Sequence, residues 1–460
     1  MKLTKQILAD KWYWFVLLIM YGFFFTTMIY ADFAVTFEHG VILCEAIFSG
    51  RFFEFYDMAV EGVYNNPAVY DIGIYLLWAI WCIPVYIVTR FWHVAAAQTP
   101  VLMLYGKVFV VLFHFLTVNL LVKMADVLSF DEKKKRMLVL LFCSSICMVI
   151  PTIGNGQFDI IPTYFMMLGV YMFMKEDYGK FLIVMSFAVS FKIFAIFIAV
   201  PLVLYKQKKI LYIIRDCIAI LVASVFFNVL FWGKTTDYYD KLYFHSPDQY
   251  TTGWIQKMME AELPAGIGNI SWFVLFFVLL CGYAYFGKRR QESDGETAVL
   301  FSFLTFFNFF LFIGAHPQWI VLLIPFVYLI AMKRESHYRF NLVLATLVDV
   351  MFFVCLSYRW YNVFWSSNEF KGLQMIFPFP ETQRLGGSLK GFIDGMGFEY
   401  AYPGLVAVLF AICLVFLYQV VSNKDTFREI EEKNFEKRMM VSRLAFMGVH
   451  ILSLLLLAYV

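Results

Sequence analysis

The chain has 460 residues, of which 62% are hydrophobic, 20% aromatic and only 15% charged, and its formal net charge is +3. A single soluble core cannot bury this share of apolar side chains, so the composition excludes an ordinary soluble enzyme and indicates a polytopic membrane protein. The positive residues are spread along the chain instead of forming one basic face, so we expect no nucleic-acid partner. Most of the eight cysteines lie inside apolar stretches, and their spacing predicts neither a disulfide framework nor a metal site.

Nearly uncharged stretches recur along the whole chain, and a bilayer core of about 30 Å requires about 20 apolar helical residues for each crossing. Ten-residue segments of alternating polarity are absent, so these crossings are expected to be helices. We therefore predict an all-α polytopic membrane protein with about 11–14 transmembrane helices. The predicted helical segments are 12–30, 72–89, 104–122, 137–153, 160–174, 181–205, 210–232, 270–287, 297–314, 318–332, 340–357, 402–421 and 444–460.

Lysine and arginine residues predict the orientation of these segments. By the positive-inside rule, the lysines before the first segment place the N-terminus in the cytoplasm. The basic runs that agree are 206–209, 288–290, 333–334 and the loop 424–443. No small-residue cleavage site follows the first segment, so we expect it to be retained as a membrane helix. The loops expected outside are long, rich in aromatic and acidic residues, and the expected place for the chemistry. These loops are 31–70, 233–269 and 358–400.

One basic stretch conflicts with a simple alternation of crossings. The sequence DEKKKR at 131–136 favours the cytoplasm, whereas strict alternation from the 72–89 segment onward places it outside. If 91–103 and 181–205 each contain a half-crossing or a broken helix, DEKKKR moves inside and GNGQFD at 154–159 moves outside. We favour this arrangement, because broken membrane helices occur where the backbone lines a polar cavity.

Polar residues near the predicted outer face have both an ordinary and a functional interpretation. Asp32, Glu38 and His39 lie in YADFAVTFEHG, where the chain leaves its first apolar segment. Asp32 is either an interfacial carboxylate or a reactive one, and the other two are either a solvated loop face or ligands. Gln157 and Asp159 either cap the helix that starts near residue 160 or face a substrate.

A lysine inside an apolar segment is harder to explain by structure alone. Lys192 is the only charged residue in FAVSFKIFAIF, and an intramembrane lysine is costly unless it faces a cavity or an anion. His316 lies between two apolar segments, where a structural histidine is an equally good explanation. Taken together, these acidic, amide, lysine and histidine groups predict one polar cavity at the outer face.

The order of these motifs resembles that of the C-type (GT-C) membrane glycosyltransferases, which take sugars from polyprenyl phosphates. Asp32-Phe33 is similar to the acidic motif that follows the first helix in this family, and Lys192 is similar to a lysine that precedes a proline-containing apolar run. The other stretches that carry the resemblance are GRFFEFYD at 50–57, NNPAVYDIGIYLLWAIWCIP at 65–84, GQFD at 156–159, GNISW at 268–272 and HPQWIVLLIP at 316–325.

The chain also departs from the family pattern. The acid of the first loop is often doubled in the family, but Phe33 follows Asp32, so a second acid would be Glu38 or Asp57. The histidine hairpin carries Pro317 and Gln318 where eukaryotic relatives have acidic and basic residues, which leaves the donor and the acceptor open.

The resemblance implies a GT-C-like fold, in which residues 1–232 form the transmembrane module, the external loop 31–70 carries juxtamembrane helices, 233–269 is an external loop and 270–460 holds further helices. It implies inverting transfer to a glycan or glycolipid, with Asp32 as general base and Lys192 and His316 binding the donor phosphate. A Mg²⁺ or Mn²⁺ ion is compatible with this scheme. The residues expected to bind sugar or acceptor are Gln157, Asp159, Glu38, His39, Asp57, Asn269 and Gln318. A bacterial plasma membrane with an extracytoplasmic site is the expected location.

Two other functions fit part of the sequence. A flippase or secondary transporter of lipid-linked sugars would also place charged groups inside a helical bundle. A glycan polymerase or ligase would carry acidic and arginine residues in a late external loop. The corresponding residues of the 358–400 loop are Arg359, Glu369, Glu381 and Arg384.

Overall fold

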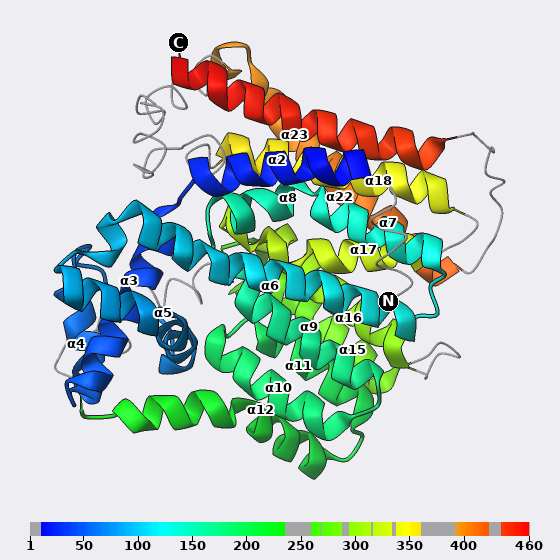
Figure 1. Cartoon of the computed structure of the whole chain (residues 1–460). Coiled ribbons are helices and arrows are strands. Elements are labelled where there is room, and N and C mark those ends of the chain that lie inside the picture. Colours follow the sequence, from blue (N-terminus) through cyan, green and yellow to red (C-terminus); the bar gives the residue numbers. More distant parts are fainter. Residues whose placement is uncertain are drawn as a thin grey trace. The chain divides into compact units, whose positions relative to one another are not determined.

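The structure is a computed structural model, and its helices cover most of the described chain (Figure 1). The predicted loops 233–269 and 358–400 lie largely outside the described residues, as do the basic runs at the N-terminus and at 288–290. The structure describes residues 11–234, 258, 260–266, 268–287, 294–313, 316–333, 337–359, 391, 393–422 and 434–459.

The described residues confirm an all-α polytopic membrane protein. Among the described residues, seven helices are long and apolar enough to cross a membrane, or up to nine if each of two bent helix pairs forms one span. Five further apolar helices have 10–17 residues. The predicted 11–14 spans therefore require some of these shorter helices to cross the membrane. The described part of the chain has one antiparallel hairpin, formed by β1 (Glu262–Ala265) and β2 (Gly268–Ser271).

The chain forms two compact units, and both are built from separated parts of the sequence. The first unit consists of residues 1–30, 110–160 and 316–460, and the second consists of residues 31–109 and 161–315. Each unit thus combines residues from before and after position 270, which the sequence analysis assigned to different regions.

The first unit is a helical bundle around α18, which packs against α17, α22 and α23, while α2 packs against α23. In Figure 1 these helices lie together near the C-terminus. The elements of this unit are α2 (Lys11–Thr27), the part of α6 (Pro100–Val127) from residue 110, α7 (Glu132–Cys143), α8 (Ile146–Val149), the π-helical turn η3 (Ile150–Gly154), η5 (Pro317–Leu322), α17 (Ile324–Lys333), α18 (Tyr338–Arg359), α22 (Phe398–Ser422) and α23 (Phe435–Tyr459).

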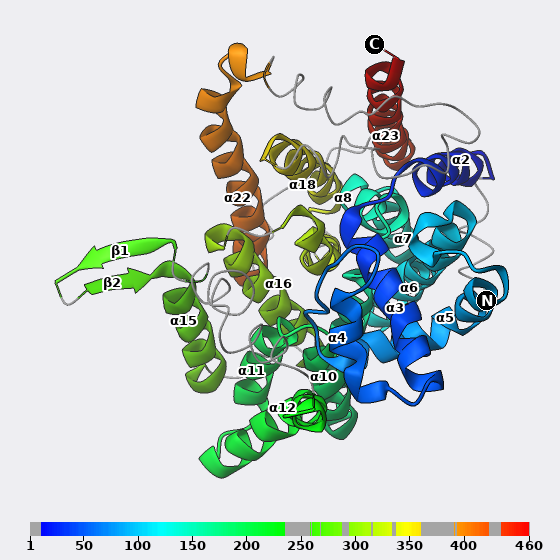
Figure 2. The same cartoon turned by 90° about the vertical axis from the view of Figure 1, so that its left-hand side faces the viewer.

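The second unit contains two closely packed helix pairs, α3 with α5 and α10 with α12, and α15 packs on α11 and α16 (Figure 2). The β1–β2 hairpin extends from the start of α15. The elements of this unit are α3 (Ala31–Phe48), η1 (Phe52–Glu54), α4 (Phe55–Val60), α5 (Ile72–Trp92), η2 (Ala96–Gln98), the start of α6, α9 (Ile160–Met174), α10 (Tyr178–Phe191), α11 (Ala195–Lys206), α12 (Ile210–Phe231), β1, β2, α15 (Trp272–Phe286) and α16 (Asp294–Phe312).

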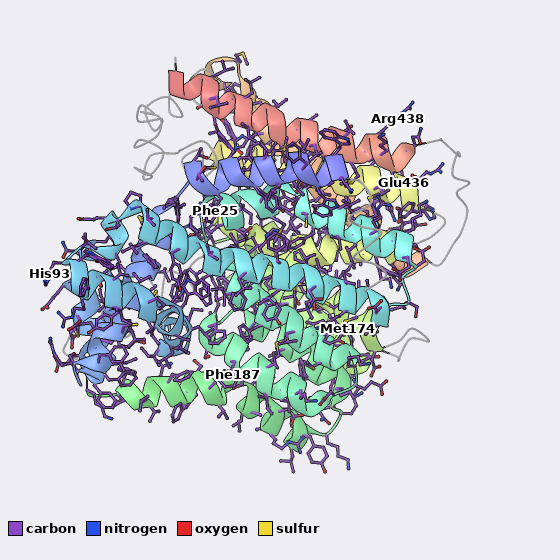
Figure 3. All side chains as sticks on the ribbon, viewed as in Figure 1. Phe25, His93, Met174, Phe187, Glu436 and Arg438 are labelled. Carbon is purple, nitrogen blue, oxygen red and sulfur yellow. The ribbon has the colours of Figure 1, made fainter. Side chains whose placement is uncertain are left out.

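Local sequence signals begin and end several helices. The Asp131 carboxylate accepts a hydrogen bond of 2.7 Å from the Lys134 N–H and so caps α7. The Ser271 hydroxyl caps α15 in the same way through the Val274 N–H, at 3.3 Å. At the other end of a helix, His93 (labelled in Figure 3) adopts the left-handed conformation with φ of 53° and terminates α5.

The predicted interruption of the 181–205 segment is confirmed, because α10 ends at Phe191 and α11 begins at Ala195. Within 91–103 the helical structure is also interrupted, because α5 ends at Trp92 and α6 begins at Pro100. Two other predicted segments prove discontinuous as well. The 137–153 segment bends by 55° between α7 and α8, and the 318–332 segment begins as the 3-10 helix η5 before α17.

The predicted external loop 31–70 contains two helices, α3 and α4. Helices within this loop were expected, although their position at a membrane surface stays a prediction. α3 has 18 residues, and it packs along α5 in the second unit.

Candidate functional site

Lys192 lies at the break between α10 and α11 in the second unit. Its own backbone is extended, with φ of −158° and ψ of 120°, and its N–H makes the last hydrogen bond of α10, to the Ala188 carbonyl at 2.9 Å. The side chain is buried, with only 6% of the residue exposed. The chain therefore interrupts an apolar helix at the position of a buried cation.

Two aromatic rings flank the ammonium group of Lys192. Its Nζ lies 5.8 Å from the ring centroid of Tyr70 and 5.2 Å from that of Phe194. Ring faces attract cations within about 6 Å, and the attraction is larger where water is excluded. Tyr70 comes from a distant part of the sequence, so the folded chain brings the loop before α5 to the helix break.

The segment Glu61–Asp71, which we call the α4–α5 loop, is fastened at its C-terminal end. The Tyr70 carbonyl accepts a hydrogen bond from the Tyr56 hydroxyl at 3.0 Å, and the Tyr70 N–H donates to the Tyr75 hydroxyl at 3.4 Å. The carboxylate of Asp71 accepts hydrogen bonds from Ser224 (2.5 Å) and Asn228 (2.8 Å) of α12. Burial raises the pKa of Asp71, and these two hydrogen bonds partly offset the rise.

The same loop is fastened near its N-terminal end by Glu38 and His39 of α3, which are 7% and 2% exposed. The carboxylate of Glu38 accepts hydrogen bonds from the backbone N–H groups of Val63 (2.7 Å) and Tyr64 (3.4 Å). His39 Nε2 lies 3.0 Å from the Asn66 carbonyl, which only accepts hydrogen bonds, so this nitrogen carries the proton. Both predicted ligands are thus in contact with the loop backbone, and their predicted role toward sugar or acceptor stays a prediction.

Asp32 and Asp57 occupy the first turns of α3 and α4, where free backbone N–H groups favour a carboxylate. Asp32 is exposed, and Asp57 is half-buried. Both residues belong to the same unit as Lys192. α5 packs against α3, which carries Asp32, and against α10, which Lys192 follows.

Two contacts define the position of α5 between these helices. Phe33, next to Asp32, packs on Trp78 with ring centroids 6.1 Å apart. Gly73 faces the end of α10, since a Cβ on residue 73 would lie 3.2 Å from the Ser190 Oγ. These two positions on α5 are separated by about 8 Å along the helix axis.

The first unit contains the other predicted ligands in two short segments. Gln157 and Asp159 are 1% and 2% exposed and lie between the π-helical turn η3 and α9. His316 is half-buried and precedes η5, with its ring 4.7 Å from that of Trp319, and Gln318 within η5 is 4% exposed. Since η5 packs against α8, which η3 continues, the two segments belong to one region of this unit.

Asn269 lies on the exposed β1–β2 hairpin, apart from the other predicted ligands of the second unit. Its side-chain amide donates a hydrogen bond of 2.5 Å to the Glu262 carboxylate across the hairpin. The hydroxyl of Ser271 in the same triplet donates to the Met258 carbonyl and caps α15. This arrangement accounts for both side chains as hairpin contacts.

Several buried polar residues were missed by the sequence analysis. Lys107 in α6 is fully buried, and it follows Gly106, where a Cβ would lie 2.7 Å from the Phe37 ring. In the first unit, Arg443 and Asp349 form a buried ion pair of 3.1 Å. Lys107 and Asp349 are single charges inside the predicted apolar segments 104–122 and 340–357, the same signal that pointed to Lys192, whereas Arg443 precedes the predicted 444–460 segment.

Within the described residues, no group of three or more histidine, cysteine, aspartate or glutamate side chains is arranged to hold a metal ion. The predicted Mg²⁺ or Mn²⁺ ion therefore stays a prediction. Comparison with known proteins leaves the family open: no protein-family model matches the chain, and no curated protein matches it.

Proposed function

We propose that this protein transfers a sugar from a polyprenyl-phosphate donor to a glycan or glycolipid acceptor, with inversion at the anomeric carbon. The observation that carries the proposal is the buried Lys192 at the break between two apolar helices, under the ring of Tyr70. A lysine in such a position is favourable when it meets an anion, and a polyprenyl phosphate supplies an anion at the edge of the bilayer.

In the proposed reaction Asp32 is the general base. Its carboxylate takes the proton of the acceptor hydroxyl while the acceptor oxygen attacks the anomeric carbon, and the bond from that carbon to the phosphate oxygen breaks. The electron pair leaves with the polyprenyl phosphate. Lys192 stabilises the negative charge that develops on this leaving group. The exposure of Asp32 in the first turn of α3 supports its role, because the acceptor must approach the carboxylate.

The other predicted ligands enter the proposal as separate expectations. The predicted roles of His316, Gln157, Asp159 and Gln318, which belong to the first unit, stay predictions and supply no step of the proposed reaction. Asp57, half-buried in α4, would contact the acceptor.

Transfer by purified protein in nanodiscs, with a panel of synthetic polyprenyl-phosphate sugars and candidate acceptors, tests the proposal. Asp32→Asn is expected to lower kcat by at least about a hundredfold, the usual contribution of a general base, while donor binding changes little. Glu45→Gln is the matched control, since Glu45 is a carboxylate on the same helix that pairs with Arg90 at 2.8 Å. Wild-type turnover by Asp32→Asn would remove this residue from the mechanism.

A second candidate, a flippase of lipid-linked sugars, is favoured by the interrupted helices α7–α8 and α10–α11, because discontinuous helices form the binding sites of many transporters. Proteoliposomes containing a fluorescent lipid-linked sugar separate the two functions. Movement of the label between leaflets without formation of a glycosidic bond would support the flippase and exclude the transferase.

A further inference from the structure

The tip of the α4–α5 loop is a turn whose backbone N–H groups donate hydrogen bonds to a residue outside the loop. The Asn65 N–H donates to the Gly62 carbonyl at 3.0 Å, which closes a turn, and Asn65 itself has φ of 47°. This turn leaves the N–H groups of Val63 and Tyr64 pointing away from it, and the Glu38 carboxylate accepts both. The acid thus fixes the shape of an exposed turn from a buried position on α3.

A close approach at Gly62 brings the turn onto this carboxylate. A Cβ on residue 62 would lie 3.3 Å from the Glu38 Cδ and 3.0 Å from the Ile42 side chain. A larger residue would therefore require the Ile42 side chain or the loop to shift by a few tenths of an ångström. A glycine at position 62 thus allows the turn to approach the Glu38 carboxylate closely.

His39 connects the same fastening to Tyr70. Its ring packs edge-on against the ring of Tyr75, with centroids 5.5 Å apart, and the Tyr75 hydroxyl accepts a hydrogen bond from the Tyr70 N–H. Tyr75 is only 1% exposed, so it has little freedom to move independently. The contacts thus run without a gap from α3 through Tyr75 to the residue whose ring covers Lys192.

We infer that Glu38 and His39 are positioning residues, which hold the α4–α5 loop so that Tyr70 covers the Lys192 ammonium. This inference rests on the proposed function, where Lys192 binds the donor phosphate, and it adds that the loop sets the strength of that binding. A covered ammonium meets the phosphate in a site from which water is excluded, where their attraction is stronger than in water. The two α3 residues act through Tyr70 and need not touch the substrate.

A double-mutant cycle tests whether Glu38 acts through Tyr70. In Glu38→Gln the side-chain carbonyl oxygen can accept only one of the two N–H groups without strain, so we expect the KM for the donor to rise about fivefold with kcat nearly unchanged. Tyr70→Ala removes the ring and is expected to have an effect of about the same size, whereas Tyr70→Phe retains it. The KM of the double variant for the donor is expected to be no higher than that of the single variant with the larger KM. Additive effects would overturn the inference.

A second measurement does not depend on transfer activity. Amine labelling followed by mass spectrometry reports the accessibility of Lys192, which should rise about threefold or more in Glu38→Gln and in Tyr70→Ala. Lys206 at the end of α11 is the internal reference for general unfolding, and it pairs with Asp294 of α16. Cys44→Ala is the matched control variant, because Cys44 is buried on the same helix and bonds to the Ala79 carbonyl of α5 instead of the loop.

The two readouts separate the inference from the proposed function. If labelling rises in both variants but the wild-type protein transfers no sugar, the positioning role stands and the proposed function fails. If the wild-type protein transfers sugar while neither labelling nor KM changes in Glu38→Gln, the proposed function stands and the positioning role is wrong.

Discussion

The two units each contain a helix break beside a buried cation, and the two cations have different surroundings. At the α7–α8 break, the Arg443 guanidinium pairs with Asp349 and donates to Ser144 at 2.8 Å and to the Leu141 carbonyl at 2.9 Å. At the α10–α11 break, the Lys192 ammonium lies against the rings of Tyr70 and Phe194.

The difference distinguishes a structural charge from one suited to a ligand. The planar guanidinium of Arg443 joins α7, α17, α18 and α23 through directed hydrogen bonds, so its place is fixed by the protein. A lysine ammonium is a compact charge on a flexible stem, and ring faces stabilise it without fixing the direction of its N–H groups. Arg443 is thus held by directed hydrogen bonds to other helices, whereas the ammonium of Lys192 lies against two aromatic rings at a helix break.

The largest effect is expected from Arg443→Met. This change leaves the Asp349 carboxylate buried without its counter-charge, which costs about 3–5 kcal/mol of stability. Thermal unfolding in detergent should show a strongly lowered Tm or loss of folded protein. Arg438→Met, at an exposed position five residues earlier on α23 (Figure 3), should unfold near the wild-type temperature. Equal stability of the two variants would contradict the structural role of Arg443.

Lys192→Met is expected to behave in the opposite way. Its stability is expected to fall by less than that of Arg443→Met, since methionine retains the packing of the apolar lysine stem. Donor affinity should fall by about ten- to a hundredfold, because one charge-assisted contact with the phosphate is lost. Lys206→Met on α11 provides the control. A strongly destabilised Lys192→Met protein would make Lys192 a structural charge like Arg443.

Ser145→Ala sharpens the comparison at the α7–α8 break. The Ser145 hydroxyl donates to Asp349 at 2.6 Å and caps α8 through the Met148 N–H at 3.2 Å. Its loss should lower stability by about 1–2 kcal/mol without any change in donor KM. Denaturation and transfer kinetics on the same preparation check both statements, and a changed KM would place this break in the site.

The smallest effect on stability is expected from breaking an exposed ion pair, and it serves as the reference for the other variants. Arg90→Gln breaks the 2.8 Å pair with Glu45, where the two side chains are 64% and 30% exposed. Such pairs contribute at most about 1 kcal/mol, and less at high salt. A shift in Tm comparable to that of Arg443→Met would show that the stability assay does not separate local from global effects.

Much of the helical layout was predictable, because apolar length is a strong signal. The segment 160–174 coincides with α9, and the break within 181–205 followed from the charge conflict around it. Residues 31–48, which form α3, were assigned to an external loop that carries juxtamembrane helices. The partners that make Glu38 and His39 compatible with a buried helix lie in the α4–α5 loop, 25 to 27 positions away.

The candidate site was predictable only in part. Lys192 was identified because its segment contains no other charge, whereas Arg443 was counted among the basic residues of a cytoplasmic loop, as the helix was expected to begin at 444. In the structure α23 begins at Phe435, so Arg443 lies inside a helix. Tyr70 carried no signal at all, since its importance comes from a contact across 122 positions of the chain, which a single sequence does not reveal.

The turn at residues 62–65 is held through its backbone, while two of its side chains are exposed. Glu38 binds backbone N–H groups, while the side chains of Val63 and Tyr64 are 46% and 37% exposed. Substitutions at these two positions therefore leave the hydrogen bonds intact, whereas a Cβ at position 62 would lie within 3.3 Å of Ile42, Ala59 and Glu38. A lineage of such proteins would be able to alter its outward chemistry by single exchanges at the turn and keep the framework beneath it.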